Sequence, residues 1–399
     1  MIDLKAARAD PGGFGAALAR KGAAEAFEQL LAADARWREL VPRVDELRAR
    51  TKLKGRPTPE QLEELQRVKE ELRVAEERLA EAERERDELA LRVPNIPHPT
   101  VPDGATEEDV DELRRVGEPP VLADPREHTE IGRFEMERAA RIAGSRFGYW
   151  VGDTALVAVA LYRLALERLV EKGFVPVLPP VLVRENALIG TGAFPSDEAN
   201  VYELAGDGLY LAGTAEIPLS ALHLGEILAA DELPLRYVGF SPCFRREAGA
   251  AGRDTRGMIR VHQFNKVEQF SFTRPQQSWD EHELLLANTE EIVRDIGLPY
   301  RVVVLPAGDM SAASAKTYDV EIWFPSQGRY RECASISNTT DFQARRLRTR
   351  YREDGALEPV HTLNGTAVVD RMALAVLENF QGEVPESLRA YGAPARVRR

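Results

Sequence analysis

The residues best suited to bind a polyanion lie close together, between Phe244 and Glu268. This stretch contains the cations Arg245, Arg246, Arg253, Arg256, Arg260 and Lys266 and the carboxylates Glu247 and Glu268. Planar guanidinium groups match the geometry of phosphate oxygens and can contact two of them at once. The stretch is therefore predicted to bind a polyanion, and a nucleoside triphosphate is the expected ligand.

Strand periodicity predicts which of these side chains face the ligand. Two ordered arms flank a glycine-containing loop at residues 249–257, so the segment is expected to form a β-hairpin. Successive side chains of a strand point to opposite faces. One face of the second arm would then carry Arg260, His262, Phe264, Lys266 and Glu268. Phe264 offers a ring on which a base could stack, whereas a solvated, salt-bridged hairpin is the simpler explanation of the charges alone.

The elements that must position these side chains form a predicted mixed α and β region. Helical periodicity is found at residues 154–172 and 279–296, and strand patterns are found at 236–244, 260–272, 301–305, 318–324 and 330–337. Strands joined by short turns indicate an antiparallel sheet, so the predicted fold class is α+β. Neither a GxGxxG motif nor a Walker lysine motif occurs, which excludes the commoner nucleotide-binding folds.

Residues from about 30 to 93 are predicted to form two helices folded against each other. Apolar residues recur every three or four positions in both, as in a heptad seam. Residues 55–59 (GRPTP) interrupt the pattern, so an antiparallel coiled-coil arm is expected. A helix over residues 60–93 would be roughly 50 Å long. Two residues do not fit: Pro42 should kink or interrupt the first helix, and Arg86 occupies a seam position.

Basic side chains gather toward the tip of this arm, at Arg43, Arg48, Arg50, Lys52, Lys54 and Arg56. A basic tip could bind RNA through phosphate contacts, which position a nucleic acid without reading its bases. A coiled coil that serves solubility or binds a partner protein would show the same heptads. Periodicity alone favours that second alternative.

A proline-rich segment at residues 93–104 separates the arm from the rest of the chain. Its prolines exclude both a helix and a central strand, and they are Pro94, Pro97, Pro99 and Pro102. We place the domain boundary here. Residues 1–103 are predicted to form a helical N-terminal domain, and residues 104–399 a second domain.

Composition limits the classes of protein to which the chain can belong. The 399 residues carry a net charge of −12, and 44% are hydrophobic, as expected for a soluble protein of two or three domains. No apolar run approaches the roughly 20 residues that cross a bilayer, and the N-terminus lacks a secretion-signal layout. Cys243 and Cys333 are expected to be reduced thiols in the cytoplasm. The acidic balance argues against broad, non-specific nucleic-acid binding.

Five short motifs resemble those of the class II aminoacyl-tRNA synthetases, and most closely those of the seryl-tRNA synthetase family. The charged stretch is similar to motif 2, which reads F-R-x-E, a loop and R-x-x-x-F. Residues 173–180 (GFVPVLPP) resemble motif 1, and residues 363–371 (LNGTAVVDR) resemble motif 3. Residues 213–216 (GTAE) are similar to the amino-acid-binding loop, and residues 330–338 to the strand that holds ATP and its metal. All five occur in the family's order.

The resemblance implies an antiparallel class II catalytic domain at residues 104–399 and a tRNA-binding coiled-coil arm within residues 1–103. It implies an aminoacyl-tRNA ligase that uses ATP and Mg²⁺ to convert L-serine to seryl-adenylate and then transfers serine to tRNA(Ser). A homodimer would form through motif 1. The alternatives are a paralogue that activates serine or an analogue for biosynthesis or resistance, and a catalytically inactive coiled-coil adaptor.

The resemblance also implies roles for the residues around ATP. Arg245 would bind the α-phosphate and the substrate carboxylate, and Arg260 and Arg371 would bind the outer phosphates. Phe264 would stack on adenine, and Glu247 would help to hold it. Because activation needs positioning and charge neutralisation more than covalent help, the catalytic set would be Arg245, Glu247, Arg260 and Arg371.

The remaining roles concern the metal and the serine. Glu332 and Ser335 would bind Mg²⁺, a hard ion that prefers oxygen. They have opposite strand parity, so a bulge or a strand end is required between them. Residues 366–370 lack the second glycine of many family members, which predicts a less accommodating backbone near ATP. The serine pocket would be lined by Thr214, Glu216, Arg245, Glu268, Asn364 and Thr366.

Overall fold

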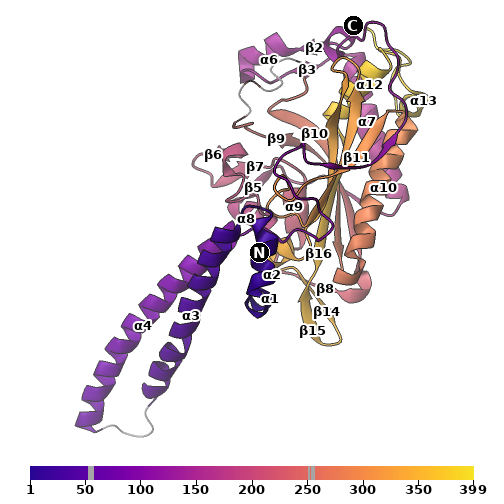
Figure 1. The fold of residues 1–399 in the computed structure, drawn as a ribbon. Coiled ribbons are helices and arrows are strands. Elements are labelled where there is room, and N and C mark those ends of the chain that lie inside the picture. Colours follow the sequence, from indigo (N-terminus) through magenta and orange to yellow (C-terminus); the bar gives the residue numbers. More distant parts are fainter. Residues whose placement is uncertain (53–57, 250–251, 253–256) are drawn as a thin grey trace. The chain divides into compact units, whose positions relative to one another are not determined.

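The computed structural model describes residues 1–52, 58–249, 252 and 257–399. They form two compact units, Met1–Ile96 and Pro97–Arg399, which Figure 1 shows as ribbons. The division falls within the proline-rich segment. Four of the cations named above lie outside the described residues, namely Lys54, Arg56, Arg253 and Arg256.

The N-terminal unit consists of helices α1 (Leu4–Ala9), α2 (Pro11–Ala19), α3 (Ala24–Arg50) and α4 (Pro59–Arg92). A capping box starts α4, because the Thr58 hydroxyl accepts from Gln61 N (3.2 Å) and the Gln61 side chain accepts from Thr58 N (2.9 Å). Figure 1 shows α3 and α4 side by side as a long hairpin. The predicted antiparallel coiled-coil arm is confirmed.

The arm accommodates the two residues that do not fit the heptads, Pro42 and Arg86, in different ways. Pro42 lies inside α3, so the helix is not interrupted there. Proline removes one backbone hydrogen bond, but Val44 and Leu47 on its C-terminal side remain buried against the partner helix. Arg86 lies over the Trp37 ring, with its guanidinium carbon 4.1 Å from the ring centre. A cation–π contact therefore replaces an apolar seam contact.

An eight-stranded sheet forms the centre of the second unit, in the order β1-β11-β12-β13-β16-β10-β9-β4. Every neighbouring pair is antiparallel except β4 and β9, which are parallel. The predicted α+β class is confirmed. The strands are β1 (Asp111–Val116), β4 (Val175–Val177), β9 (Leu235–Phe244), β10 (Gln263–Thr273), β11 (Tyr300–Val304), β12 (Lys316–Phe324), β13 (Arg329–Asn338) and β16 (His361–Val369).

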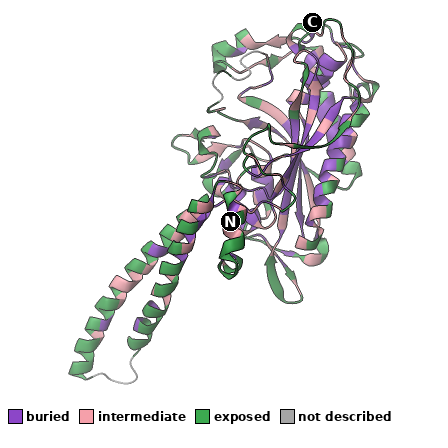
Figure 2. Ribbon diagram, in the orientation of Figure 1, coloured by how far each residue is buried: buried purple, intermediate pink, exposed green. Residues whose placement is uncertain are grey.

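Helices α7 (Asp153–Glu171) and α10 (Ser278–Ile296) pack against one face of this sheet. Leu161 and Leu164 of α7 and Leu285 of α10 join strand residues such as Val267 and Val368 in one hydrophobic core. Figure 2 shows the buried residues along the strands and on the helix sides that face them. Because strand side chains alternate, Lys266 and Glu268, on either side of Val267, point to the opposite face.

Shorter elements surround the sheet. The helices are α5 (His128–Ile131), α6 (Met136–Ala143), α8 (Glu185–Thr191), α9 (Glu216–Ser220), α11 (Phe342–Leu347), α12 (Asp370–Asn379) and α13 (Glu386–Arg389), with 3₁₀ turns η1 (Glu198–Asn200), η2 (Ala221–His223), η3 (Ala230–Glu232) and η4 (Pro275–Gln277). The strands are β2 (Phe134–Glu135), β3 (Tyr149–Trp150), β5 (Leu182–Arg184), β6 (Tyr202–Leu204), β7 (Leu209–Leu211), β8 (Ile227–Ala229), β14 (Arg350–Glu353) and β15 (Ala356–Pro359). Within the described ranges, no helix is both long and apolar enough to span a bilayer.

The second arm of the charged hairpin starts later than predicted. Strand β10 begins at Gln263, so Arg260 and His262 precede it. The reason lies in the partner strand: β9 ends at Phe244, and Arg246 N then donates to Asn200 O (2.8 Å) instead of to β10. Arg260 is therefore held by a turn, whereas Lys266 and Glu268 are held by the sheet.

Candidate active site

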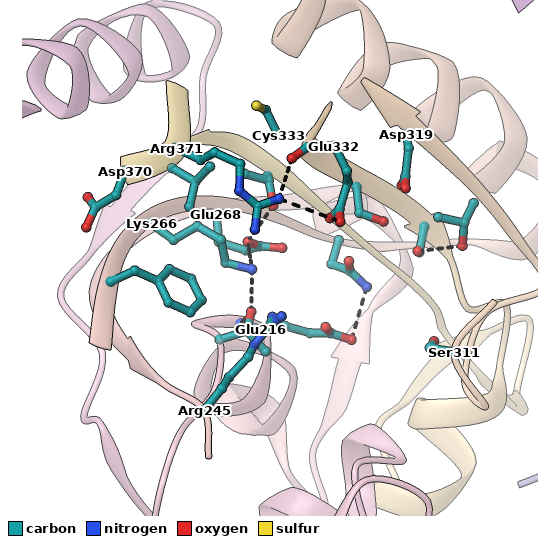
Figure 3. A pocket seen from close by; sticks show the side chains of 18 of the residues that line it. Glu216, Arg245, Lys266, Glu268, Ser311, Asp319, Glu332, Cys333, Asp370 and Arg371 are labelled. Atoms are coloured by element: carbon teal, nitrogen blue, oxygen red, sulfur yellow. Dashed lines mark hydrogen bonds and ion pairs between the residues drawn. The ribbon is translucent and has the colours of Figure 1, made fainter. Parts of the chain in front are cut away.

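A cavity of about 520 Å³ opens on the sheet face opposite α7 and α10. Side chains from β10, β12, β13, β16, α9 and the ends of the charged hairpin line it, as Figure 3 shows. The structure brings every predicted site residue to this one cavity: Thr214, Glu216, Arg245, Glu247, Arg260, Phe264, Glu268, Glu332, Ser335, Asn364, Thr366 and Arg371.

Two carboxylates define one end of the cavity. Glu216, the first residue of α9, accepts on Oε1 from Gln343 Nε2 (2.7 Å) and Asn364 Nδ2 (3.0 Å). Glu268, on β10, is buried and pairs with Lys266 Nζ at 2.5 Å. Its Oε2 also accepts from the Thr366 hydroxyl at 3.5 Å. Figure 3 shows Glu216 and Glu268 on either side of Lys266.

The surroundings of both carboxylates favour the protonated form. Burial, and then the nearby Glu268 charge, raise the pKa of Glu216 to about 7, against the opposing effects of Lys266, Gln343 and Arg245. Glu216 lines the cavity and is partly accessible, but the protein around it still limits its hydration. Burial also raises the pKa of Glu268, and Lys266 opposes that rise. A nearby positive charge would favour the ionised form of both acids. The pair therefore suits a small ligand that carries a positive charge and a hydroxyl group.

Thr214 connects this end to the sheet. Its hydroxyl accepts from Lys266 Nζ (2.7 Å) and from Glu216 N (3.1 Å). The cation Lys266 is thus held between the Thr214 hydroxyl and the Glu268 carboxylate. Strand periodicity predicted that Lys266 and Glu268 share the ligand-facing side of the hairpin, but no role was assigned to Lys266.

Arginines dominate the middle of the cavity. Arg245 follows β9, and its Nε donates to Gly213 O at 3.2 Å. Its guanidinium carbon lies 5.3 Å from the centre of the Phe264 ring, which keeps the two groups adjacent. Arg260 is paired with Glu247. Glu247 has a φ of 52°, a left-handed conformation that costs a non-glycine residue some energy.

Arg371 completes the arginine set. It lies in the first turn of α12, which directly follows β16. Its terminal nitrogens donate to the backbone oxygens of Glu332 (2.5 Å) and Ile259 (3.3 Å). The preceding residue, Asp370, is buried and accepts from the Tyr162 hydroxyl and from Asn265 N (3.0 Å). Burial raises the pKa of Asp370 to about 6.

Glu332 and Ser335 both line the cavity because β13 contains a bulge. Val320 of β12 pairs with Ala334, but the next residue, Glu321, pairs with Glu332, so Cys333 has no partner in the ladder. The extra residue reverses the parity between Glu332 and Ser335. The bulge required by the sequence is therefore present.

A third oxygen-bearing side chain in this region, that of Asp319, was not predicted from the sequence. Asp319 of β12 lies opposite Ser335, which hydrogen-bonds its carboxyl group. Its Oδ1 is buried and has no hydrogen-bond partner within the described parts of the chain. Burial, and then the charge of Glu332, raise the pKa of Asp319 well above its usual value. Asp319 could have been identified from the sequence, because strand periodicity places Thr317, Asp319 and Glu321 on one face.

The oxygen set fits a divalent cation that also binds a substrate. Mg²⁺ in proteins is commonly bound by one or two carboxylates, with the rest of its shell from water and phosphate. Asp319 and Glu332 supply two carboxylates, and a cation between them would relieve the charge that raises the pKa of Asp319. Across the residues with described positions, no cluster of three or more His, Cys, Asp or Glu side chains forms a self-sufficient metal site.

Comparisons with known proteins agree on one family. The family model for the seryl-tRNA synthetase N-terminal domain matches residues 1–97. The model for the class II tRNA synthetase core domain (G, H, P, S and T) matches residues 201–380. The chain is 45% identical to a serine–tRNA ligase of Thermobifida fusca over 98% of its own length and 97% of that protein. It is 44% identical to a serine–tRNA ligase of Acidothermus cellulolyticus, with 98% of each chain covered.

Solved structures give the same answer. The seryl-tRNA synthetase of Pyrococcus horikoshii, complexed with ATP, superimposes with a TM-score of 0.94 at 37% identity and covers 100% of this chain and 99% of its own. The cytoplasmic serine–tRNA ligase of Naegleria fowleri, in complex with AMP, gives a TM-score of 0.87 at 31% identity, with 96% and 95% covered. The chain belongs to the seryl-tRNA synthetase family of class II aminoacyl-tRNA synthetases.

Proposed function

We propose that the protein is a serine–tRNA ligase: it activates L-serine with ATP to form seryl-adenylate and transfers the seryl group to tRNA(Ser). The observation that carries this proposal is a single cavity that joins a two-carboxylate pocket to a row of three arginines. The relatives that share this architecture along nearly their whole length are serine–tRNA ligases. The alternative of a paralogue with another purpose is therefore not favoured.

The carboxylate end of the cavity binds the amino acid in this proposal. Ionised Glu216 accepts hydrogen bonds from the serine ammonium group, and Thr214 and Asn364 lie beside it. Glu268 accepts a hydrogen bond from the serine hydroxyl, and the Thr366 hydroxyl can donate one to it. Alanine lacks that hydroxyl, so it would leave buried polar groups unpaired, which such sites reject strongly.

The arginine row binds the nucleotide. Arg245 contacts the backbone of Gly213, next to Thr214 at the serine end, and the Phe264 ring, so it is placed to neutralise both the serine carboxylate and the α-phosphate during attack. Arg260 and Arg371 would bind the outer phosphates, and Phe264 would stack on adenine. Glu247, paired with Arg260 in this structure, would exchange that partner for the adenine amino group. Positioned charges of this kind supply most of the rate in reactions without a covalent enzyme intermediate.

Glu332, Ser335 and Asp319 would hold Mg²⁺. The bound cation would supply positive charge beside the phosphate oxygens of ATP. Asp319 adds a ligand to the two that resemblance implied, because it faces Ser335 across the β12–β13 ladder. Cys333 is buried at the bulge between the two proposed ligands, and burial raises the pKa of its thiol to about 12. A neutral thiol is a poor ligand for a hard cation.

The helical region within residues 1–103 would bind tRNA(Ser) through the α3–α4 arm, and residues 104–399 would form the catalytic domain. Three predicted phosphate-binding arginines pair with glutamates of α4: Arg43 with Glu71 (3.4 Å), Arg48 with Glu76 (3.0 Å) and Arg50 with Glu64 (2.8 Å). These exposed pairs contribute little stability, so a tRNA phosphate could replace the glutamate at small cost. Lys52 is exposed beside them.

We also propose a homodimer in the cytoplasm. An apolar stripe remains exposed along α7 and the motif 1 residues that follow it, formed by Leu156, Val159 and Val170 of α7 with Val175 and Leu178. Exposed apolar groups that line up in this way are typical of protein–protein interfaces. A cytoplasmic location is supported by Cys243 and Cys333, which are free thiols.

The direct test measures two activities of the same preparation. Serine-dependent exchange of pyrophosphate into ATP reports the first step, and attachment of labelled serine to tRNA(Ser) reports the second. The proposal predicts both activities. Exchange without charging would favour the paralogue, and absence of ATP binding would favour the inactive adaptor.

A further inference from the structure

Gln343 is a buried glutamine behind the carboxylate end of the cavity. It lies on α11 and is fully inaccessible to solvent, with a relative exposure of 0%. It does not line the cavity, but its amide group contacts Glu216, which does. Its role must therefore be exerted through Glu216, not through contact with a ligand.

The neighbours of Gln343 fix the orientation of its amide group. The backbone oxygen of Thr191 can only accept, so the nitrogen Nε2 must face it (3.2 Å). The oxygen Oε1 then faces hydroxyl groups that can donate to it, the Thr362 hydroxyl at 2.9 Å and the Thr339 hydroxyl at 3.4 Å. A flipped amide would place two acceptors against each other at Thr191.

The second amide proton of Gln343 therefore points to Glu216 Oε1. Asn364 Nδ2 donates to the same oxygen. With two donors on Oε1, a proton bound to Glu216 has to reside on Oε2. A ligand would therefore contact Oε2. This oxygen accepts a hydrogen bond when Glu216 is ionised and donates one when Glu216 is protonated.

We propose that Gln343 is a positioning residue for amino-acid binding, which keeps Glu216 ionised and turns Oε2 toward the substrate. This inference rests on the proposed function and deepens it, because it names a residue outside the cavity that sets the affinity for serine. The charged groups that face Glu216 are Glu268 and Lys266 of β10 and Arg245 after β9, and Gln343 is the neutral donor from α11.

The balance of these groups explains why one amide matters. Burial and Glu268 raise the pKa of Glu216 to about 7, and Gln343 is one of the groups that oppose the rise. At neutral pH, a carboxyl group with this pKa is present in both forms. A small loss of stabilisation of the ionised form then removes much of the acceptor that the serine ammonium group needs.

The first test replaces Gln343 with methionine, which has a similar volume and no donor. We expect the KM for serine in pyrophosphate exchange to rise about tenfold at pH 7, as for loss of a hydrogen bond to a charged group. The KM for ATP should stay within about twofold. The ratio of the variant KM to the wild-type KM should fall as pH rises from 6 to 8.5, because Glu216 ionises again.

The second test replaces Gln343 with glutamate and should give the opposite pH trend. At low pH the protonated glutamate can still donate to Glu216 Oε1. At higher pH it ionises and repels Glu216, so the KM ratio for serine should rise with pH. Opposite trends in Gln343→Met and Gln343→Glu would not arise from a general loss of folding.

Gln269→Met is the matched control. Gln269 is equally buried, and its amide is satisfied by Leu285 O (3.1 Å), Thr289 Oγ1 (3.2 Å) and Asn288 Nδ2 (2.8 Å). It faces α10, away from the cavity, so this change should lower the thermal unfolding temperature without a pH-dependent rise in the KM for serine.

Three results would overturn the inference. The first is an unchanged KM for serine in Gln343→Met, and the second is a KM ratio with the same pH trend in both Gln343 variants. If Gln343→Met does not fold, Thr362→Val carries the test, because it removes the hydroxyl that orients the amide. It should give a smaller rise with the same trend as methionine, and no rise is the third contrary result. A wild-type enzyme without serine-dependent exchange would instead refute the proposed function itself.

Discussion

Glu216 and Glu268 contribute two carboxyl groups to one small pocket that Lys266 and Arg245 also face, and among the described residues no cation forms an ion pair with Glu216. Lys266 pairs with Glu268, and amide donors from Gln343 and Asn364 reach Glu216. A ligand with an ammonium group would supply the ion-pair partner of Glu216. The pocket is thus electrostatically incomplete without its amino acid, which is a source of affinity.

This balance predicts a pH dependence. Because the pKa of Glu216 is about 7, its ionised fraction grows as pH rises from 6 to 8. The KM for serine in pyrophosphate exchange should fall over that range, and the KM for ATP should change little. Glu216→Gln should bind serine weakly at every pH and lose the dependence. A wild-type KM for serine that is flat from pH 6 to 8 would contradict the assignment of Glu216.

Arg245 is the residue whose loss should cost most activity. Its guanidinium group is exposed in the cavity beside Phe264 and has one described hydrogen bond, to Gly213 O. Arg245→Ala should lower exchange activity by roughly 10²–10³-fold or more, as expected for loss of a charge that stabilises a transition state. The thermal unfolding temperature should stay near that of the wild type.

The neighbouring Arg246 provides a matched control for this change. It is also exposed, but it does not line the cavity. Arg246→Ala should retain exchange activity. Near-normal exchange in Arg245→Ala would remove this residue from the catalytic set.

At the scale of elements, the sheet converts distant motifs into one site. Strands β10 and β16 are neighbours, so Glu268 and Thr366 face each other across a ladder pair. The bulge at Cys333 brings Glu332 and Ser335 to the same face. A second bulge leaves Ala367 of β16 unpaired, between Thr366 and Val368. Ala367 belongs to the stretch at residues 366–370 that lacks the second glycine of many family members.

Local patterns were sufficient to predict most of these elements but not their irregularities. The predicted helix at residues 279–296 and the strand at 236–244 agree with α10 and β9 to within one residue. The late start of β10 depends on Asn200 of the distant turn η1, whose backbone oxygen accepts from Arg246 N. Asp319 and Gln343 depend on pairing across strands and on helix packing. Those contacts join residues that are far apart in the chain, so no short stretch of sequence could have predicted them.

The arm should be separable from the chemistry. Its helices contact each other along their length and form their own core with Phe27 and Leu30 at the base. Replacement of residues 40–75 with a short glycine linker should leave pyrophosphate exchange intact and strongly reduce tRNA charging. Both steps are measured on the same preparation. Equal loss of both would show that the arm is needed for adenylate formation and would contradict a purely tRNA-binding role.

At the scale of the whole molecule, the exposed motif 1 stripe predicts the oligomeric state. Val159 and Val175 are 55% and 54% exposed. The protein should sediment as a dimer at micromolar concentration, and Val159→Glu should shift it toward the monomer because a charge buried in an interface is unpaired. Leu62→Glu, at an exposed apolar residue of α4, should remain dimeric. A monomeric wild type would contradict the dimer.

The central claim is that this cavity selects serine and activates it with ATP. Pyrophosphate exchange measured with each of the twenty amino acids in turn tests that claim most directly. We expect strong exchange with serine, exchange with alanine lower by roughly 10⁴-fold, and weak exchange with threonine. Equal exchange with alanine and serine, or a preference for another amino acid, would contradict it.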